Sequence, residues 1–534
     1  MGLSACVFRN GPIVTMEPGA ASAECVVTEG DRIAFVGPLD AGRALIAERG
    51  LVAMDYDLDG AALLPGFIDA HLHPLPMIFF AMSANLDALS SLEEVRAALT
   101  RQAERIDAGE WVIGVQLEEN KLQGGDALSR RELDAWLGDV PALVYSRDGH
   151  AVFVNSAVLE KAGLGADTAI PDGGEAGRFM DGELNGVFRE KAVGLPLAHM
   201  PPPSIPRMIE ASKACFDALA RSGITSIGAM LQSDEEGPGG EAAQLEAIAM
   251  QAIREHVPQS IYAIVIGKTL DGVKAMADSP MNDPQNATRT RAFKIFADGT
   301  FGSCTACMSE PYADKTCSHG FMTLPEDDIY ARMEAAHLAG FQVCIHAIGD
   351  EGIAKCVDLF ERLLSAHPRE DHRHRIEHAS FAPPELVARI AGLGLQICTQ
   401  PLFIRSEMAW LPRRLGPSRT PMAYPFRSFF DAGIALAGSS DAPIEATDTI
   451  AAIDFAVNRG GFHPEQGVSV EEALAMFTRN AAFVQFEETE KGTLQAGKRA
   501  DLVILDCNPL TVPPDQLGRI AVKRTMIGGI FTPN

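Results

Sequence analysis

Three polar side chains alternate at the end of an apolar stretch in the segment LLPGFIDAHLHP, residues 63–74. The three are Asp69, His71 and His73, and in a β-strand residues i and i+2 point to the same side. The two imidazoles would therefore share one direction and could both reach a metal ion at the bond length of about 2.0–2.1 Å that zinc requires. Asp69 lies on the same face and is expected to orient a ligand or to brace the strand.

Four more polar residues stand in or just after apolar stretches that read as strands. Lys294 occurs in AFKIFADG, His346 in VCIHAIGD, His378 in RIEHAS and Asp441 in ALAGSSDAP. A single histidine in a strand is more often part of the core than a ligand, but the whole set favours a metal site. Near two metal ions, a buried lysine can lose its proton and react with carbon dioxide to give a bridging carbamate. A helper cation is the other interpretation of Lys294, and the spacing leaves both open.

Parallel strands are the elements that would bring these residues together. The middle of the chain alternates apolar strands with amphipathic segments such as EDDIYARMEAAHLAG (326–340) and PPELVARIAGLG (383–394). This alternation predicts an α/β fold built on a (β/α)8 TIM barrel, whose chemistry lies at the carboxyl ends of the strands. The eight candidate strands are Leu63–His73, Ile224–Met230, Ile261–Ile266, Phe293–Asp298, Val343–Ile348, Arg375–Ala379, Leu395–Gln400 and Ile434–Ser440.

Both ends of the chain read as β-structure outside the barrel. The segment CVVTEGDRIAFVGP (25–38) predicts two strands around a turn, and similar patterns return near the C-terminus. Residues 1–62 and 486–534 are therefore expected to form one small β-sandwich domain, with the barrel over 63–485. The gap between the first two candidate strands is too long for one βα unit, so residues 80–205 are expected to be an insertion after the first barrel strand.

The bulk composition excludes several classes of partner. The formal net charge is −26, which argues against nucleic acid and anionic membranes. No apolar run of 18 or more residues and no signal peptide is found, so no membrane span is expected. The ten cysteines are scattered, which suits free thiols in a reducing compartment and favours a cytoplasmic location. A homodimer is expected on base rates alone.

Two smaller features receive plainer interpretations. Cys304 and Cys307 form a CTAC pair, but no second pair follows to complete a structural zinc site. His372 and His374, in DHRHR, lie among charged residues and are expected to face solvent.

Ordered motifs along nearly the whole chain resemble the amidohydrolase superfamily of metal-dependent hydrolases, most closely its amidohydrolase 3 (YtcJ-like) group. The motifs that carry the resemblance are PGFIDAHLHP, SRDGHAVFVNS, DGELNGVFREKA, FKIFADGTFGS, IHAIGD, RIEHAS, GSSDAPIEATD and GTLQAGKRADLVILD.

The resemblance implies a role for each matching residue. His71 and His73 would hold the more buried metal. Lys294, N6-carboxylated, would bridge it to a second metal held by His346 and His378. Asp441 would contact the metals and act as general base and acid.

Other implied roles concern the substrate. His150, from the insertion, would reach the substrate and stabilise the developing oxyanion. Cys304 stands where the group often has arginine, so it is expected to contact the substrate. Glu190 is a second substrate-binding candidate, and it is also a rival to Lys294 as the bridging ligand.

These features predict an enzyme that hydrolyses a C–N bond other than a peptide bond. The expected substrate is an amide, N-acyl compound or cyclic amide of small size, attacked by metal-activated hydroxide. The cofactor would be one or two divalent ions per chain, zinc first. One alternative is a mononuclear deaminase of a heterocycle, for which Asp350 and Glu351 follow His346. The other is a catalytically silent ligand-binding or regulatory protein on the same fold.

Overall fold

A computed structural model describes residues 5–87, 89–118, 122, 128–146, 151–171, 174–201, 203–236, 244–283, 285 and 287–533. The chain divides into two compact units. Unit 1 combines Met1–Pro74 with Phe216–Asn534, and unit 2 is Leu75–Cys215. No helix of the described residues is both long enough and apolar enough to cross a membrane.

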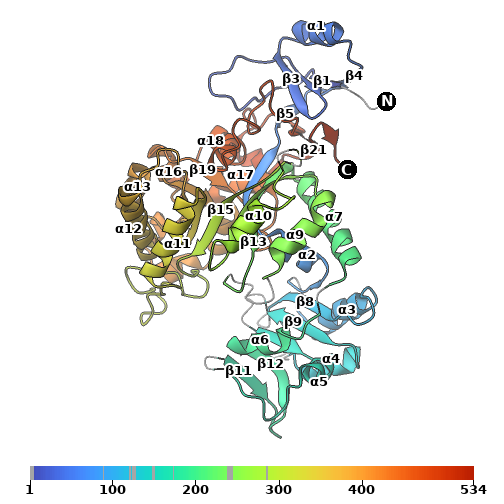
Figure 1. The fold of residues 1–534 in the computed structure, drawn as a ribbon, viewed down its shortest axis with the longest axis vertical. Coiled ribbons are helices and arrows are strands. Elements are labelled where there is room, and N and C mark those ends of the chain that lie inside the picture. Colours follow the sequence, from blue (N-terminus) through green and yellow to red (C-terminus); the bar gives the residue numbers. More distant parts are fainter. Residues whose placement is uncertain are drawn as a thin grey trace. The chain divides into compact units, whose positions relative to one another are not determined.

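An eight-stranded sheet forms the centre of unit 1 (Figure 1). Its strands follow one another in chain order and every neighbouring pair is parallel, as expected for a (β/α)8 barrel. The predicted fold class is confirmed, and each predicted strand overlaps one strand of this sheet. The strands are β6 (Phe67–Leu72), β13 (Ile224–Gln232), β14 (Ser260–Ile266), β15 (Thr288–Phe296), β16 (Gln342–Ala347), β17 (Arg375–His378), β18 (Gln396–Thr399) and β19 (Leu436–Gly438).

Backbone hydrogen bonds close the barrel between its last strand and its first. The Asp441 N–H donates to the His71 carbonyl at 2.8 Å, and the His73 N–H donates to the Ala442 carbonyl at 2.8 Å. The segment after β19 is therefore fixed against β6 at the residues that the sequence assigns to chemistry.

The predicted strand Leu63–His73 is two strands in the structure. β5 (Ala62–Pro65) pairs with β20 (Leu502–Leu505), whereas β6 pairs with β13. Gly66 lies between them, and a Cβ there would come within 2.3 Å of the Thr225 side chain. The chain thus passes from a small sheet into the barrel through one residue that has no room for a side chain.

Two small sheets contain the remaining strands of unit 1. One has the order β3-β2-β1-β4 and the other β22-β21-β20-β5. Phe8 and Val26 from the first pack in one apolar cluster with Leu63, Leu502 and Met526 from the second. Segments near both ends of the chain therefore share a core, while the predicted domain boundaries themselves stay a prediction. The bounds are β1 (Ala5–Arg9), β2 (Cys25–Glu29), β3 (Arg32–Gly37), β4 (Ala53–Asp57), β21 (Val522–Ile527) and β22 (Ile530–Phe531).

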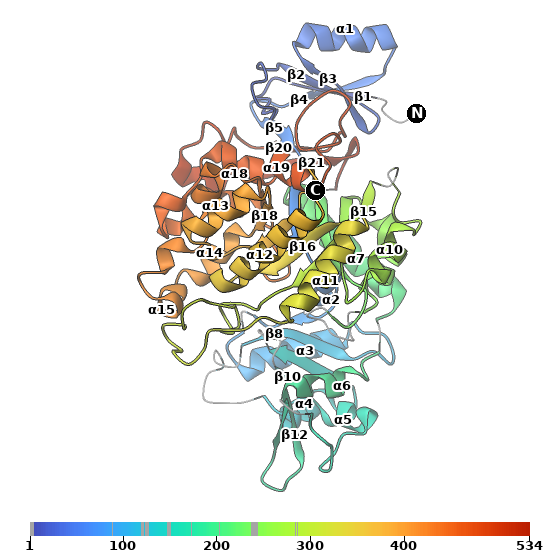
Figure 2. The ribbon, with the colours of Figure 1, turned by 60° about the vertical axis from the view of Figure 1, so that its left-hand side comes forward.

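Helices follow most of the barrel strands and cover the barrel from outside. α11 and α12, which follow β15 and β16, lie side by side (Figure 2). α11 begins after Pro325 with three acidic residues in its first turn, which suits the positive end of the helix dipole. The helices of unit 1 are α1 (Leu39–Arg49), α9 (Glu246–Ile253), α10 (Asp271–Ala277), α11 (Glu326–Leu338), α12 (Asp350–Ala366), α13 (Pro384–Gly392), α14 (Pro401–Glu407), α15 (Leu411–Leu415), α16 (Phe426–Asp431), α17 (Thr449–Val457), α18 (Val470–Met476) and α19 (Arg479–Val484). α7 (Ile205–Arg221) spans the end of unit 2 and the resumption of unit 1.

Unit 2 contains a six-stranded mixed sheet of order β11-β12-β10-β9-β8-β7. Its apolar faces pack against its own helices, with Leu99 and Leu133 in one buried cluster and Val158 and Phe188 in another. The elements are α2 (Pro74–Ala81), β7 (Ala84–Asn85), α3 (Leu92–Ala103), β8 (Val112–Leu117), α4 (Arg130–Leu137), β9 (Ala142–Ser146), β10 (Ala151–Val154), α5 (Ser156–Ala162), β11 (Gly174–Arg178), β12 (Leu184–Glu190) and α6 (Gly194–Leu197).

The expectation that His372 and His374 face solvent is wrong, because both side chains are buried near the amino ends of β16 and β17. The Val343 N–H donates to Nδ1 of His374 at 2.9 Å, so Nε2 of His374 carries the proton and donates to Nδ1 of His337 at 2.8 Å. His337 in turn donates from Nε2 to the His367 carbonyl at 2.9 Å. Every ring nitrogen of His337 and His374 has a hydrogen-bond partner while both imidazoles are neutral. Burial of the pair therefore leaves no ring nitrogen unpaired.

This histidine pair should make the barrel less stable in acid. Burial lowers the pKa of His337 and lowers that of His374 further. Each folded pKa is depressed, so unfolding takes up a proton once the pH falls below the ordinary value of about 6.5. We expect His374 to cost up to about 1.4 kcal/mol in unfolding free energy between pH 7.5 and 5.5, and His337 to add a smaller loss.

Urea unfolding of the full chain at both pH values measures this loss. The variant His374→Gln is expected to lose about 1.4 kcal/mol less than the wild type over this range, while His463→Gln, at a partly exposed site, should behave as the wild type. An unchanged pH dependence in His374→Gln would contradict the assignment.

Candidate functional site

The residues predicted to bind metal gather at the carboxyl ends of the barrel strands, all within unit 1. The imidazole rings of His71 and His378 have their centroids 5.2 Å apart, and those of His346 and His378 are 4.5 Å apart. His73 follows directly, with its ring 5.5 Å from that of His71. Residues from β6, β16 and β17 therefore form one cluster, which Asp441 after β19 completes.

His71 is oriented by a carboxylate that sequence reasoning missed. Its Nδ1 lies 2.7 Å from Oε2 of Glu377, and both side chains are fully buried. Burial alone would raise the pKa of Glu377, but the Arg375 guanidinium and His71 hold it well below its usual range. The carboxylate is therefore ionised and accepts the Nδ1 proton, which leaves Nε2 of His71 as the nitrogen with a free lone pair.

Glu377 is itself held by Arg375, two residues earlier in β17. The Arg375 guanidinium donates through Nε to Oε1 of Glu377 and through Nη2 to the Ala70 carbonyl at 3.0 Å. Arg375 is fully buried, and its Nη1 has no hydrogen-bond partner among the described residues. A chain of contacts thus runs from Arg375 through Glu377 to His71.

Hydrogen bonds also fix which nitrogens of His378 and His346 remain available. Nδ1 of His378 lies 2.8 Å from Oε1 of Gln400, whose amide donates to the Ser439 hydroxyl. Nε2 of His346 lies 3.1 Å from the Gly299 carbonyl. His378 therefore presents Nε2 and His346 presents Nδ1. Burial lowers the pKa of His346 to about 3 and that of His378 well below its ordinary value, so both rings are neutral.

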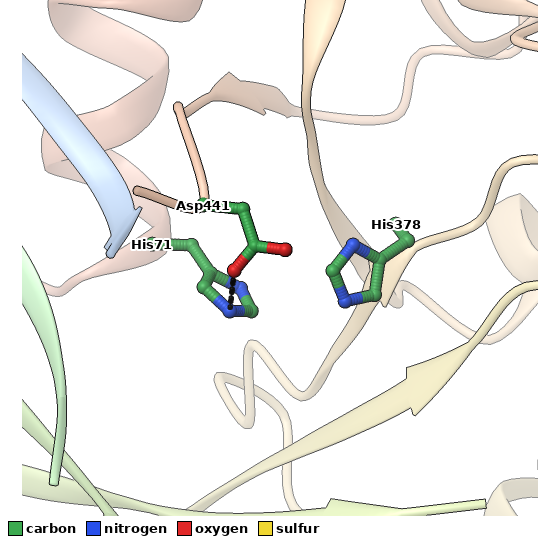
Figure 3. Close-up of side chains that lie close together, drawn as sticks. All are labelled: His71, His378 and Asp441. Carbon is green, nitrogen blue, oxygen red and sulfur yellow. Dashed lines mark ion pairs between the residues drawn. The ribbon is translucent and has the colours of Figure 1, made fainter. Parts of the chain in front are cut away.

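Asp441 faces these nitrogens at close range. Its Oδ1 lies 3.2 Å from Nε2 of His71 (Figure 3). The same oxygen lies 3.2 Å from Nε2 of His73. This oxygen is buried and has no partner with hydrogen-bonding geometry among the described residues. Burial would raise the pKa of the Asp441 carboxyl, but the histidines hold it well below its usual range. The carboxylate oxygen thus lies 3.2 Å from two imidazole nitrogens, an arrangement that suits a shared cation.

The donor set fits a divalent metal ion. Ligand atoms of His71, His378 and Asp441 all lie within 4.8 Å of one another. Imidazole nitrogen and carboxylate oxygen are the ligands that zinc and related ions bind. The same cluster contains left-handed backbone at His378 (φ 72°) and Asp441 (φ 58°). Strain of about 1–3 kcal/mol at such a residue is tolerated where function needs it.

Lys294 lies in β15 with a side chain that is 1% exposed. Burial lowers its pKa, although the charges of Glu377 and Asp441 act in the opposite direction. The amine forms no hydrogen bond or ion pair with the described residues. A buried lysine with a lowered pKa is more readily neutral, and a neutral amine is the form that reacts with carbon dioxide.

Two further aspartates support the backbone around the cluster. Asp69 accepts hydrogen bonds from the N–H groups of Ser440 and His71, so it braces the strand ends rather than orienting an imidazole. Asp298 accepts from the N–H groups of Cys307, Ile348 and Gly349. Burial raises the pKa of both carboxyls to about 7.

The roles of the three predicted substrate-binding residues stay predictions. His150 lies outside the described residues, so its role stays a prediction. Glu190 ends β12 in unit 2, and its roles as substrate contact or bridging ligand also stay predictions. Cys304 lies after β15 in unit 1, is buried and carries a free thiol next to the Arg414 guanidinium, which also donates to the Phe301 carbonyl.

Comparison with known proteins assigns the family. A model of the amidohydrolase family matches residues 56–532, so the chain belongs to this family. YtcJ of Bacillus subtilis (strain 168) is 30% identical over 484 residues, which cover 89% of each chain. The N-substituted formamide deformylase of Arthrobacter pascens is 28% identical over 545 residues, covering 98% of this chain and 97% of that protein.

Solved structures agree with this assignment. A metal-dependent hydrolase from Pyrococcus horikoshii OT3 superposes with a TM-score of 0.80 at 25% identity, covering 96% of this chain and 99% of that one. One from Pyrococcus furiosus gives 0.78 at 26% identity, covering 95% and 100%. The protein is a metal-dependent amidohydrolase, a hydrolase that acts on carbon–nitrogen bonds.

Proposed function

We propose that the protein hydrolyses the C–N bond of a small amide or N-acyl compound, cyclic amides included. The observation that carries the proposal is the position of the carboxylate Oδ1 of Asp441, 3.2 Å from ring nitrogens of both His71 and His73. A carboxylate among metal-binding imidazoles can accept a proton from water and return it to a leaving group. The relative from Arthrobacter pascens is an N-substituted formamide deformylase, which makes N-substituted formamides the first compounds to test.

The residues that would hold the metal follow from the available nitrogens. His71 and His73 with Asp441 would hold one divalent ion, zinc in our proposal. His346 and His378 would hold a second, with carboxylated Lys294 between the two. Such ions, when bound, lower the pKa of water toward about 7 and polarise a carbonyl oxygen.

Side chains of the protein would carry out the proton transfer, the orientation of the imidazoles and the contacts with the substrate. Asp441 takes the proton from the attacking water and gives it to the leaving nitrogen. The contact of Glu377 with Nδ1 of His71 keeps that imidazole in one tautomer throughout. Gln400 does the same for His378. His150 is proposed to donate to the developing oxyanion, and Cys304 and Glu190 to contact the substrate.

The mononuclear deaminase remains the second candidate, and the acidic residues after His346 weigh against it. Asp350 accepts hydrogen bonds from the backbone and hydroxyl of Ser309. The Glu351 side chain is 42% exposed and lies 4.0 Å from Lys355. Neither carboxylate contacts the histidine cluster.

The catalytically silent alternative would show full metal occupancy without turnover. The cytoplasmic location, the homodimer and the absence of nucleic-acid and membrane partners stay predictions.

Metal content is the measurement that separates these candidates. We expect elemental analysis of chelator-free protein to give about two divalent ions per chain, and Lys294→Met to give about one, because the proposed bridge is lost. Lys268→Met serves as the control, since that amine lies at the surface beside Glu235.

The companion assay is hydrolysis of N-substituted formamides, followed by release of the amine. Two ions per chain with turnover supports the proposal. One ion per chain with ammonia release from heterocycles would favour the deaminase. No bound metal after reconstitution with zinc or manganese would contradict the site itself.

A further inference from the structure

A second carboxylate, Glu246, lies at the carboxyl end of the barrel and takes no part in the metal cluster. Glu246 is the first residue of α9, and its Oε2 accepts a hydrogen bond from the Gln232 N–H at 2.9 Å. Gln232 ends β13, so this contact places the carboxylate at the same end of the barrel as His73. No lysine, arginine or histidine occurs in the sequence between Gln232 and Glu246.

The neighbouring strand brings Glu246 toward the metal-binding residues. β13 pairs with β6 so that Ala229 lies opposite Leu72, the residue before His73. Gln232 is therefore displaced only a few residues beyond His73 along the barrel axis. Burial raises the pKa of Glu246 to about 7.

The structural role of Glu246 uses only one of its two carboxylate oxygens, Oε2. An acidic residue in the first turn of a helix is favourable, and the hydrogen bond from Gln232 adds to it. Both effects lower a carboxyl pKa, yet burial outweighs them. Within the described part of the chain Glu246 has no ion pair with lysine or arginine, so its second oxygen has no basic partner there.

Aromatic rings lie beside the two histidines of β16 and β17. The ring of Phe296 lies 5.4 Å from that of His346, and the ring of Phe403 lies parallel to that of His378 at 6.0 Å. The histidines on β16 and β17 are thus flanked by aromatic rings, whereas the β6 and β13 side carries the carboxylate. A substrate with one apolar and one cationic end would match this division.

We propose that Glu246 is a specificity-determining residue that binds a protonated amine of the substrate, so that the preferred substrate is an amide or N-acyl compound carrying an ammonium group. This proposal rests on the proposed hydrolysis for the reaction it serves. An ammonium group contributes three N–H donors, and a partly desolvated carboxylate binds it more strongly than a neutral group of equal size.

The test compares two N-acyl substrates of equal length, one ending in an ammonium group and one in a methyl group. We expect wild-type kcat/KM to be at least about tenfold higher for the ammonium substrate. Glu246→Gln should abolish this preference while keeping kcat/KM for the methyl substrate and the metal content unchanged. Glu255→Gln, an exposed glutamate just after α9, is the matched control and should keep the preference.

A binding measurement separates this proposal from the reaction. Calorimetric titration with n-butylammonium, compared with n-butanol, needs no turnover and is carried out on the metal-loaded full chain. Binding of the ammonium that is lost in Glu246→Gln supports the proposal even if no amide is cleaved. Equal binding of both probes by the wild type, or an ammonium preference that survives in Glu246→Gln, would overturn it. If Glu246→Gln does not fold, equal binding by the wild type remains the overturning result.

Discussion

Replacing Asp441 by asparagine is expected to lower kcat by about a thousandfold while the protein keeps its fold and most of its metal. The amide has nearly the shape of the carboxylate but cannot take a proton from water or return it to the leaving nitrogen. The backbone bond from the Asp441 N–H to the His71 carbonyl does not involve the side chain, so closure of the barrel is unaffected. The measurements are steady-state hydrolysis of an N-substituted formamide and elemental analysis of the same samples.

A matched control lies seven residues further along the chain. Asp448 caps α17 by accepting a hydrogen bond from the Ala451 N–H, and asparagine is an equally good cap. Asp448→Asn should therefore leave turnover and stability unchanged. An Asp441→Asn protein with undiminished kcat would exclude Asp441 as the proton carrier.

Replacing Glu377 by glutamine should affect both stability and metal binding. The change leaves the fully buried Arg375 guanidinium without its carboxylate partner, at an expected cost of about 3–5 kcal/mol in unfolding free energy. It also removes the charged acceptor at Nδ1 of His71, which typically lowers metal affinity by about 10–100-fold. Urea unfolding and competition with a zinc chelator measure the two effects separately.

A double variant tells the two effects apart. Arg375→Met combined with Glu377→Gln removes the uncompensated charge, so we expect much of the lost stability to return. Metal affinity should stay low, because His71 still lacks its charged partner. If the double variant also regains wild-type affinity, Glu377 does not act on the metal site through His71.

The sequence predicts the barrel well because its signals are local. Each strand is a short apolar run bounded by polar residues, and the alternation that places His71 and His73 on one side needs only two-residue spacing. The barrel rule then places Lys294, His346, His378 and Asp441 at one end. Where two sheets meet within one apolar run, as at Gly66, the same pattern reads as a single strand.

Contacts between distant segments could not be predicted in this way. Glu377 lies 306 residues from His71 in the chain, and nothing in RIEHAS identifies it as the partner of that imidazole rather than a charge paired with Arg375 alone. The prediction that His374 faces solvent is wrong for the opposite reason. Its sequence neighbours are charged, but its ring nitrogens are satisfied by Val343 and His337, which only the fold brings near.

The closure of the barrel also sets a time scale for making the site. Asp69 accepts its hydrogen bond from Ser440, which is 371 residues later in the chain. A ribosome that adds about 5–20 residues per second needs roughly 20–70 seconds to cover that distance. During this interval the first strand exists without the segment that fixes it. His71 and His73 are therefore synthesised long before Asp441, the residue proposed to transfer the proton.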